Sequence, residues 1–241
     1  MKIIADTHTH TIASTHAYST VQEMFKEASD INLYALAITD HAQTMPGSPR
    51  EWYFDNLVAI PDTLYGVRVL RGVEANVTNY EGEIDVPLHL QKSLDWIVAS
   101  IHDITLKVEE RPNVELCTKL WLNVCKNPYI RVIGHSGSHE FKYDYEKVIP
   151  EFGKNGKLVE LNNSTFKNKK DAVCNCIEIA KICKKNNVPV ILNTDAHFST
   201  AVGKFDSTLE ALKEIDFPEE LIINADVSRF KAYLKKYVDE K

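Results

Sequence analysis

The chain has 241 residues and a formal net charge of −6 at pH 7. Its hydrophobic content of 44%, with only nine Gly and nine Pro, excludes a disordered, low-complexity or collagen-like chain. The acidic balance argues against a nucleic-acid binder that works through a broad basic face. No linker or repeat divides the sequence, so we expect a single domain over residues 1–241.

The sequence predicts a cytoplasmic protein. The apolar stretch at the N-terminus is too short for a signal peptide, and no run approaches the roughly 20 apolar residues of a membrane span. The five cysteines form no Cys-x-x-Cys pair, which favours reduced cysteines in a packed core.

Short runs rich in Val, Ile and Leu predict seven strands. They are Lys2–Asp6, Tyr34–Thr39, Val67–Glu74, Trp96–Ile101, Ile130–Gly134, Leu158–Leu161 and Val188–Asn193. Helical patterns lie between or after them, at Thr20–Ile31, Glu115–Cys125, Tyr143–Phe152, Ala172–Lys185 and Asp226–Tyr237. This alternation indicates an α/β protein with a parallel sheet, and seven strands favour a closed TIM-like barrel over a flat sheet.

Metal-ligand residue types follow the predicted strands. The segments are Asp6-Thr7-His8-Thr9-His10, Asp40-His41, Glu74, His102, His135 and Asp195-Ala196-His197, and His16 follows the first strand after a short loop. In a parallel barrel these positions share the C-terminal rim, where such folds build their sites. Alternation along a strand predicts that Asp6, His8 and His10 point the same way. A rim crowded with imidazoles and carboxylates indicates bound metal ions.

These motifs resemble the PHP (polymerase and histidinol phosphatase) superfamily, and within it the YcdX-like phosphatases. The resemblance is carried by the segments above together with Ile38-Thr39-Asp40-His41, Gly134-His135 and Thr194-Asp195-Ala196-His197. Further matches are Ala13-Ser14-Thr15-His16-Ala17-Tyr18-Ser19-Thr20, Leu70-Arg71-Gly72-Val73-Glu74-Ala75-Asn76 and Gly82-Glu83-Ile84-Asp85. The resemblance covers nearly the whole chain.

The resemblance implies a distorted barrel of about seven βα units with three divalent metal ions at the C-terminal rim. By matching position, the first ion would be held by His8, His10, Glu74 and Asp195; the second by Glu74, His102 and His135; and the third by His16, His41 and His197. Glu74 would bridge two ions. The imidazole-rich ligand set favours Zn²⁺, with Mn²⁺ or Fe²⁺ as alternatives.

Five further residues are candidates for supporting the ligands or contacting substrate, and each has a structural alternative. Asp6 and Asp40 neighbour ligands and would either orient a histidine or cap a turn. Asn162 and Ser164 would donate hydrogen bonds to substrate or start a loop. Arg71 would pair with a phosphate or hold the strand in place.

The function that this pattern indicates is a metal-dependent phosphatase acting on small phosphomonoesters, with a metal-bound hydroxide as nucleophile. The alternatives are a phosphodiesterase or nuclease on nucleic-acid ends or short oligonucleotides, and a metal-binding protein without catalysis. No catalytic side chain is expected beyond the ligands, and no membrane partner. The sequence is compatible with a homo-oligomer.

Overall fold

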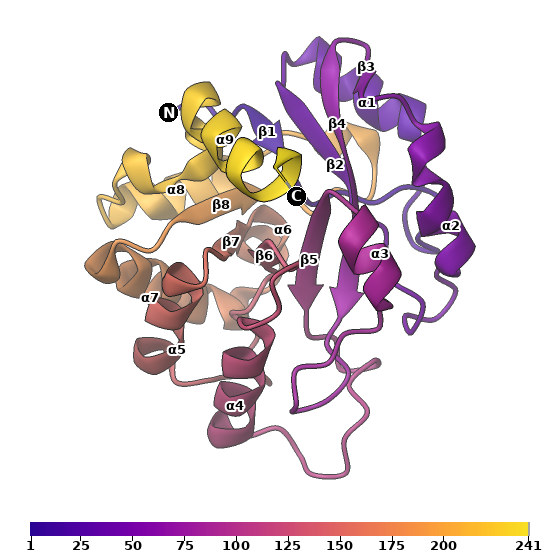
Figure 1. Cartoon of the computed structure of the whole chain (residues 1–241). Coiled ribbons are helices and arrows are strands. Elements are labelled where there is room, and N and C mark those ends of the chain that lie inside the picture. The colour runs from indigo at the N-terminus through magenta and orange to yellow at the C-terminus, as the bar shows by residue number, and fades with distance from the viewer. Residues whose placement is uncertain (241) are drawn as a thin grey trace.

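The computed structural model describes residues 1–240. Seven parallel strands follow the order β1-β2-β4-β5-β6-β7-β8, and a short β3 pairs antiparallel with β4. The strands are β1 (Ala5–Asp6), β2 (Ala35–Ile38), β3 (Thr63–Leu64), β4 (Val67–Asn76), β5 (Trp96–Ser100), β6 (Val132–Ile133), β7 (Leu158–Asn162) and β8 (Val190–Asn193). Helices surround this curved sheet (Figure 1). The predicted TIM-like α/β barrel is confirmed.

The predicted helices are present with shifted ends. They are α1 (Val21–Asp30), α4 (Val114–Val124), α5 (Tyr145–Lys154), α7 (Lys170–Asn186) and α9 (Val227–Leu234). Local signals explain the starts: Thr20 and Glu23 form a capping box before α1, and the side chains of Asn113, Asp144 and Asp226 cap α4, α5 and α9.

The sequence did not predict the remaining helical segments. The α-helices are α2 (Glu51–Asp55), α3 (Leu88–Ser93), α6 (Asn163–Asn168) and α8 (Asp206–Glu214). The single turns are η1 (Asn56–Ala59), η2 (Ser199–Ala201), η3 (Glu219–Leu221), η4 (Ile223–Ala225) and the π-helical η5 (Lys235–Asp239). Most are too short for a helical hydrophobic period to be recognised.

The seam between the first and last strands of the barrel is closed at two levels. At the C-terminal rim, Thr9 and Ala196 form an isolated parallel bridge beyond the ends of β1 and β8. Lower down, the buried Asn224 lies between the strands and donates from Nδ2 to the carbonyl oxygens of Ala5 (2.8 Å) and Leu192 (2.6 Å). An amide side chain thus takes the place of part of a strand ladder, and the barrel is distorted there.

Helix α9 closes the end of the barrel where the strands begin. Its buried Phe230 and Tyr233 pack edge-on against Trp96, with ring centroids 6.3 and 6.0 Å apart. Figure 1 shows this yellow helix beside the start of β5. With that end filled by side chains, the C-terminal rim is the end of the barrel on which the predicted ligands gather.

Candidate metal centre

The carboxylate of Glu74, in β4, is the centre of the predicted ligand cluster. Its Oε1 lies 2.9 to 3.5 Å from Nε2 of His8, His102 and His135. Its Oε2 lies 3.5 Å from Nε2 of His10 and 2.7 Å from Nδ1 of His41. Imidazoles that follow four different strands therefore converge on one buried carboxylate, with both oxygens engaged.

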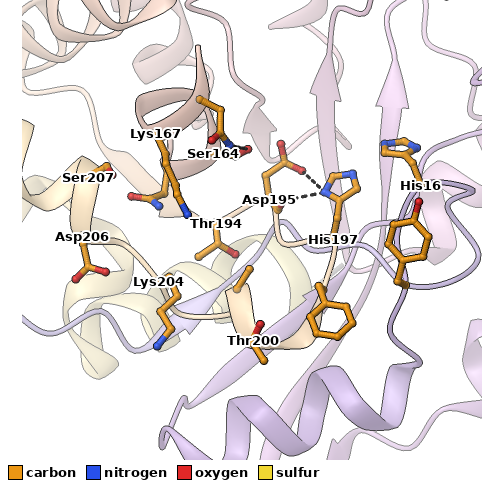
Figure 2. A pocket seen from close by; sticks show the side chains of 15 residues that line it. His16, Ser164, Lys167, Thr194, Asp195, His197, Thr200, Lys204, Asp206 and Ser207 are labelled. Atoms are coloured by element: carbon orange, nitrogen blue, oxygen red, sulfur yellow. Dashed lines mark hydrogen bonds and ion pairs between the residues drawn. The ribbon is translucent and has the colours of Figure 1, made fainter. Parts of the chain in front are cut away.

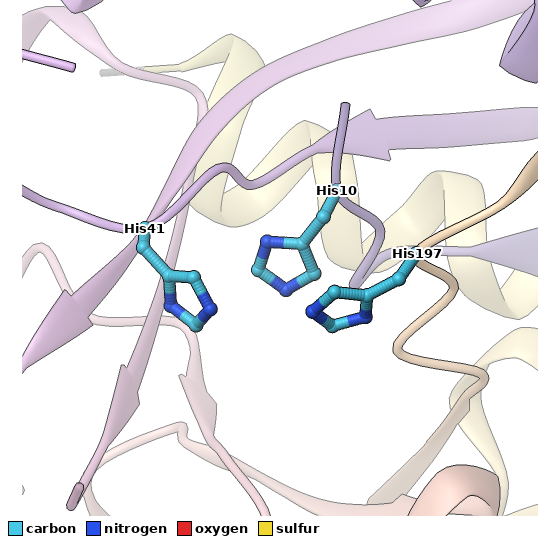
Figure 3. Close-up of side chains that lie close together, drawn as sticks. All are labelled: His10, His41 and His197. Carbon is cyan, nitrogen blue, oxygen red and sulfur yellow. The ribbon is translucent and has the colours of Figure 1, made fainter. Parts of the chain in front are cut away.

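The other predicted ligands extend this cluster. Oδ1 of Asp195 lies 3.2 Å from Nε2 of His10 and 3.6 Å from Nδ1 of His197. Nε2 of His16 lies 3.3 Å from Nε2 of His41. Figure 3 shows His10, His41 and His197 turned toward one another from three separate segments. The structure thus brings all the predicted ligands together.

Three sets of atoms lie close enough to share an ion. In each set the ligand atoms are within 4.8 Å of one another, and the sets are His8, His10 and Glu74; His41, Glu74 and His102; and His10, His41 and His197. The first set agrees with the expected grouping. The other two sets differ from the expected groups: His41 stands in place of His135 beside Glu74 and His102, and His10 stands in place of His16 beside His41 and His197.

Outer polar groups hold several imidazoles so that Nε2 faces inward. Nδ1 of His8 pairs with Oε1 of Glu160 at 2.7 Å, and Nδ1 of His102 with Oδ1 of Asn76 at 2.8 Å. Nδ1 of His10 lies 3.2 Å from Oγ of Ser14. Such partners fix ring orientation and tautomer in metal-ligating histidines.

The inward atoms fit metal ions. Within residues 1–240, Nε2 of His8, Nε2 of His10, Nδ1 of His41 and Oε2 of Glu74 are buried and form no hydrogen bond. Buried polar atoms are normally satisfied, so four such atoms in one cluster require an explanation. Divalent cations held by these residues would accept their lone pairs.

The electrostatics of the cluster keep His10 and His102 neutral, whereas the surrounding carboxylates raise the pKa of His8 and His41. Burial lowers the pKa of His10 to about 4 and that of His102 to about 3. Burial alone would raise the pKa of Glu74, but His8, His41 and His102 hold it well below its usual value. Neutral imidazole and ionised carboxylate are the forms that bind metal.

Glu160, in β7, is a supporting residue that sequence reasoning missed. Its carboxylate is buried, pairs with His8, and accepts a hydrogen bond from the backbone N–H of His135 at 2.8 Å. It also accepts from Nδ2 of Asn193 at 2.8 Å. The available signal was a glutamate inside the otherwise apolar run from Leu158 to Leu161.

Asp40 and Asp6 support loops rather than single imidazole rings. Asp40 accepts hydrogen bonds from the backbone N–H and hydroxyl of Thr11, from Ser14 Oγ and from Tyr53 Oη. It thereby fixes the loop that carries His16.

Asp6 accepts hydrogen bonds from Thr194 and from the N–H of Gly203. The expectation that its side chain shares a direction with His8 and His10 fails, because β1 ends at Asp6 and strand alternation does not continue beyond it.

Asn162 and Ser164 lie at the site, whereas Arg71 does not. Asn162 caps α6 through Oδ1, and its Nδ2 lies 3.3 Å from Oδ2 of Asp195. Arg71 donates to the carbonyl oxygens of Leu57 and Ile60 and to Asp62. The substrate role considered for Arg71 is therefore corrected to a structural one, because these acceptors engage its guanidinium away from the rim.

Two ligand positions have unusual backbone geometry. His135 has φ of +22° and Asp195 has φ of +56°, a region that residues other than Gly seldom adopt, although Asn, Asp and His are found there more often than the rest. Such conformations cost free energy and are concentrated at functional sites. Here they turn two side chains from strand ends into the cluster.

A pocket of about 810 Å³ opens beside the ligands. Its lining includes His16, Asp195 and His197 on the metal side, and Lys167 and Lys204 on the other. Figure 2 shows the two lysine side chains across the pocket from His16, with Asp195 and His197 between them. Ser164 also lines it, and the volume suits a small organic ligand.

A model of the PHP domain matches residues 6–164. The chain belongs to the PHP family. Two PHP relatives support the assignment beyond those residues, and both are named probable phosphatase. The protein from Acetivibrio thermocellus is 47% identical over 236 residues, covering 98% of this chain and 97% of that protein. The protein from Clostridium novyi is 42% identical, covering 98% and 96% respectively.

A solved structure shares the PHP fold at low identity. It is histidinol phosphate phosphatase from Lactococcus lactis, complexed with zinc, L-histidinol and phosphate, with a TM-score of 0.60 and 12% identity. The alignment covers 90% of this chain and 95% of that one. The family resemblance expected from the motifs is confirmed. Across residues 1–240, no helix is both long and apolar enough to cross a membrane.

Proposed function

We propose that the protein is a metal-dependent phosphatase that hydrolyses small phosphomonoesters. The observation that carries this proposal is the convergence of five imidazoles on the two oxygens of Glu74, with buried ligand atoms left without hydrogen bonds. The names of the relatives and the zinc and phosphate bound by the histidinol phosphate phosphatase support the same chemistry.

The ligand assignment in this proposal has three ions. His8, His10, Glu74 and Asp195 would hold the first, Glu74, His102 and His135 the second, and His16, His41 and His197 the third. Divalent ions in such a cluster activate water at neutral pH and neutralise negative charge on a phosphoryl group. Zn²⁺ is the proposed metal because imidazoles dominate the set.

Residues outside the ligand set orient the ligands and supply positive charge to the pocket. Glu160 holds His8 through Nδ1, and Asn162 lies within hydrogen-bond distance of Asp195, so two ligands are fixed before substrate arrives. Lys167 and Lys204 face the ligand side across the pocket and form no ion pair within residues 1–240. These ammonium groups are available to anionic groups of a substrate.

The pocket favours a monoester of a small molecule over a nucleic-acid strand. A strand needs a groove with repeated basic and aromatic contacts, whereas this pocket offers two lysines, Tyr18 and Phe198 within one cavity. The leaving group of a small phosphomonoester fits this space, with its phosphoryl group directed at the ligand side.

The test compares p-nitrophenyl phosphate with bis-p-nitrophenyl phosphate, using protein with measured metal content. We expect turnover of the monoester that is lost on exhaustive chelation and restored by Zn²⁺ or Mn²⁺. Preferential turnover of the diester would favour a phosphodiesterase. Turnover of neither substrate by metal-loaded protein, followed by failure in a screen of phosphorylated metabolites, would contradict the proposal.

A further inference from the structure

A second pocket lies at the opposite end of the barrel from the metal centre. It has a volume of about 420 Å³ and is lined by Lys92, Pro128, Tyr129, Arg131, Lys236 and Tyr237. Arg131 immediately precedes β6, which places the pocket where strands begin rather than where they end. Three separate parts of the chain meet there: the last turn of α3, the segment before β6, and the C-terminal η5.

The inner wall of this pocket carries a buried guanidinium with unused donor capacity. Arg131 is only 6% exposed, and its Nε is buried without a hydrogen bond. Nη1 donates to the carbonyl oxygen of Pro128, and the guanidinium carbon lies 5.8 Å from the centre of the Tyr237 ring. Within residues 1–240 no carboxylate lies at ion-pair distance from Arg131.

A second buried cation lies beside Arg131. Lys157 is 3% exposed, and its Nζ donates to the carbonyl oxygens of Asn127 and Ile130. Burial, together with the nearby Arg131, lowers the pKa of Lys157 to about 8. No Asp or Glu in the described part of the chain forms an ion pair with it.

Two exposed lysines complete the pocket at its mouth. Lys92 and Lys236 form no ion pair among residues 1–240, and Nζ of Lys236 lies 4.7 Å from the centre of the Tyr237 ring. By contrast, the neighbouring Lys235 is paired with Glu240 at 3.7 Å. Three cationic side chains thus line one cavity, Lys157 lies behind Arg131, and no acidic residue lines the cavity.

Buried charges in proteins are normally paired, because an unpaired charge in a low-dielectric setting is unfavourable. Guanidinium groups, which present several N–H donors in one plane, match the oxygens of tetrahedral anions. We propose that this pocket is an anion-binding site for a phosphate or sulfate group, either free or carried by a small metabolite. The guanidinium of Arg131 is its inner donor group, and Lys92 and Lys236 are its outer cations.

This anion connects elements that are far apart in sequence. Bound between α3, the start of β6 and η5, it holds the C-terminal segment against the end of the barrel that α9 closes. Binding to the folded state alone raises the melting temperature, by an amount that grows with ligand concentration relative to Kd. The proposal is independent of the reaction at the metal centre, which lies at the other end of the strands.

The solution test uses metal-loaded protein and inorganic sulfate, with ionic strength held constant by NaCl. We compare wild type with Lys236→Met and with the matched control Lys235→Met, which alters the adjacent lysine outside the pocket. At 20 mM sulfate we expect Tm to rise by at least about 2 °C in wild type and control, and by less than half as much in Lys236→Met. Sulfate bound at the metal centre, or acting through general salt effects, changes all three proteins equally. Equal rises would therefore overturn the proposal.

A second arm distinguishes the two sources of the anion. Phenyl sulfate at the same concentration should raise Tm more than inorganic sulfate if the ligand carries an organic group that contacts Tyr129 and Tyr237. Equal rises indicate a free anion. Crystals grown with selenate give a direct readout: an anomalous selenium peak in the pocket beside the guanidinium of Arg131 supports the site, and peaks confined to the metal centre would overturn it.

Discussion

His8 and Glu160 form a buried pair in which Oε1 of the carboxylate lies 2.7 Å from Nδ1 of the imidazole. The other oxygen of Glu160 accepts the backbone N–H of His135. One carboxylate outside the ligand set therefore supports two ligands that follow different strands. The orientation of His8 and His135 depends on the same side chain.

Glu160→Gln should weaken metal binding without unfolding the protein. The amide keeps the size of the side chain but removes the charge that holds His8, and we expect a loss of about 10- to 100-fold in metal affinity or activity. The measurement is metal titration of stripped protein, with Glu210→Gln on the exposed surface of α8 as control. Unchanged affinity in Glu160→Gln would show that the pair is not needed for metal binding.

Glu74→Gln should impair catalysis more than any substitution outside the ligand set. A carboxylate can bridge two cations with its two oxygens, whereas an amide lacks the charge to do so. We expect kcat to fall at least about 100-fold, measured on protein with determined metal content. A variant within threefold of wild type would contradict the bridging role.

Metal content tests the assignment of the third ion. Wild-type protein purified without chelator should contain about three transition-metal ions per chain, and His16→Ala should lose one of them. His89→Ala should retain all three, because His89 lies 3.4 Å from Asp55 on the surface, outside the cluster. Elemental analysis of the three proteins side by side is the measurement. Loss of metal from His89→Ala but not from His16→Ala would refute the assignment.

Lys204→Met should weaken substrate binding more than turnover. Its ammonium group lines the pocket beside the metal centre but is not among the ligands, so its removal should raise KM about 5- to 10-fold for an anionic substrate and leave kcat within about threefold. Lys213→Met, on the exposed side of α8, is the control. If KM is unchanged for every phosphomonoester that is turned over, Lys204 does not contact substrate.

The stability contributed by Lys157 should depend on pH. Its pKa is about 8 in the folded protein against 10.5 for the free side chain, so the unfolded chain holds more protons between these values and stability rises with pH across that window. The neutral amine keeps two N–H donors for the carbonyl oxygens of Asn127 and Ile130. Relative to Lys157→Met, wild type should gain about 2 kcal/mol between pH 7 and pH 10, measured by chemical denaturation in sulfate-free buffer. If the free energies of unfolding of wild type and Lys157→Met change with pH in parallel, the pKa of Lys157 is not lowered in the folded protein.

Much of the barrel and of the ligand cluster was predictable from the sequence, for identifiable reasons. Parallel strands buried on both faces produce apolar runs such as Trp96–Ile101, and ligand residues such as His102 stand directly after them. The strand ends of a barrel share one rim, so the cluster follows from topology alone.

The supporting contacts of the site and the seam of the barrel could not be predicted, because no local sequence pattern marks them. Glu160 is an isolated polar residue in an apolar strand, and its partner His8 is 152 positions away in the sequence. Arg71 was a candidate for phosphate as well as for a structural role until the structure placed the carbonyl oxygens of Leu57 and Ile60 at its guanidinium. Asn224, which completes the seam, follows no motif.

The joining of the first and last strands also governs when the metal centre can assemble during synthesis. His8 and His10 leave the ribosome early, but Asp195 and His197 follow only after most of the chain, and Asn224 later still. At about 5–20 residues per second, roughly 10 to 40 s pass between the translation of His8 and that of His197. Throughout that interval the nascent chain displays His8, His10, His16 and His41 without the residues that complete their groups. In the proposed assignment, the first and third ions therefore have a complete ligand set only after Asp195 and His197 have been made.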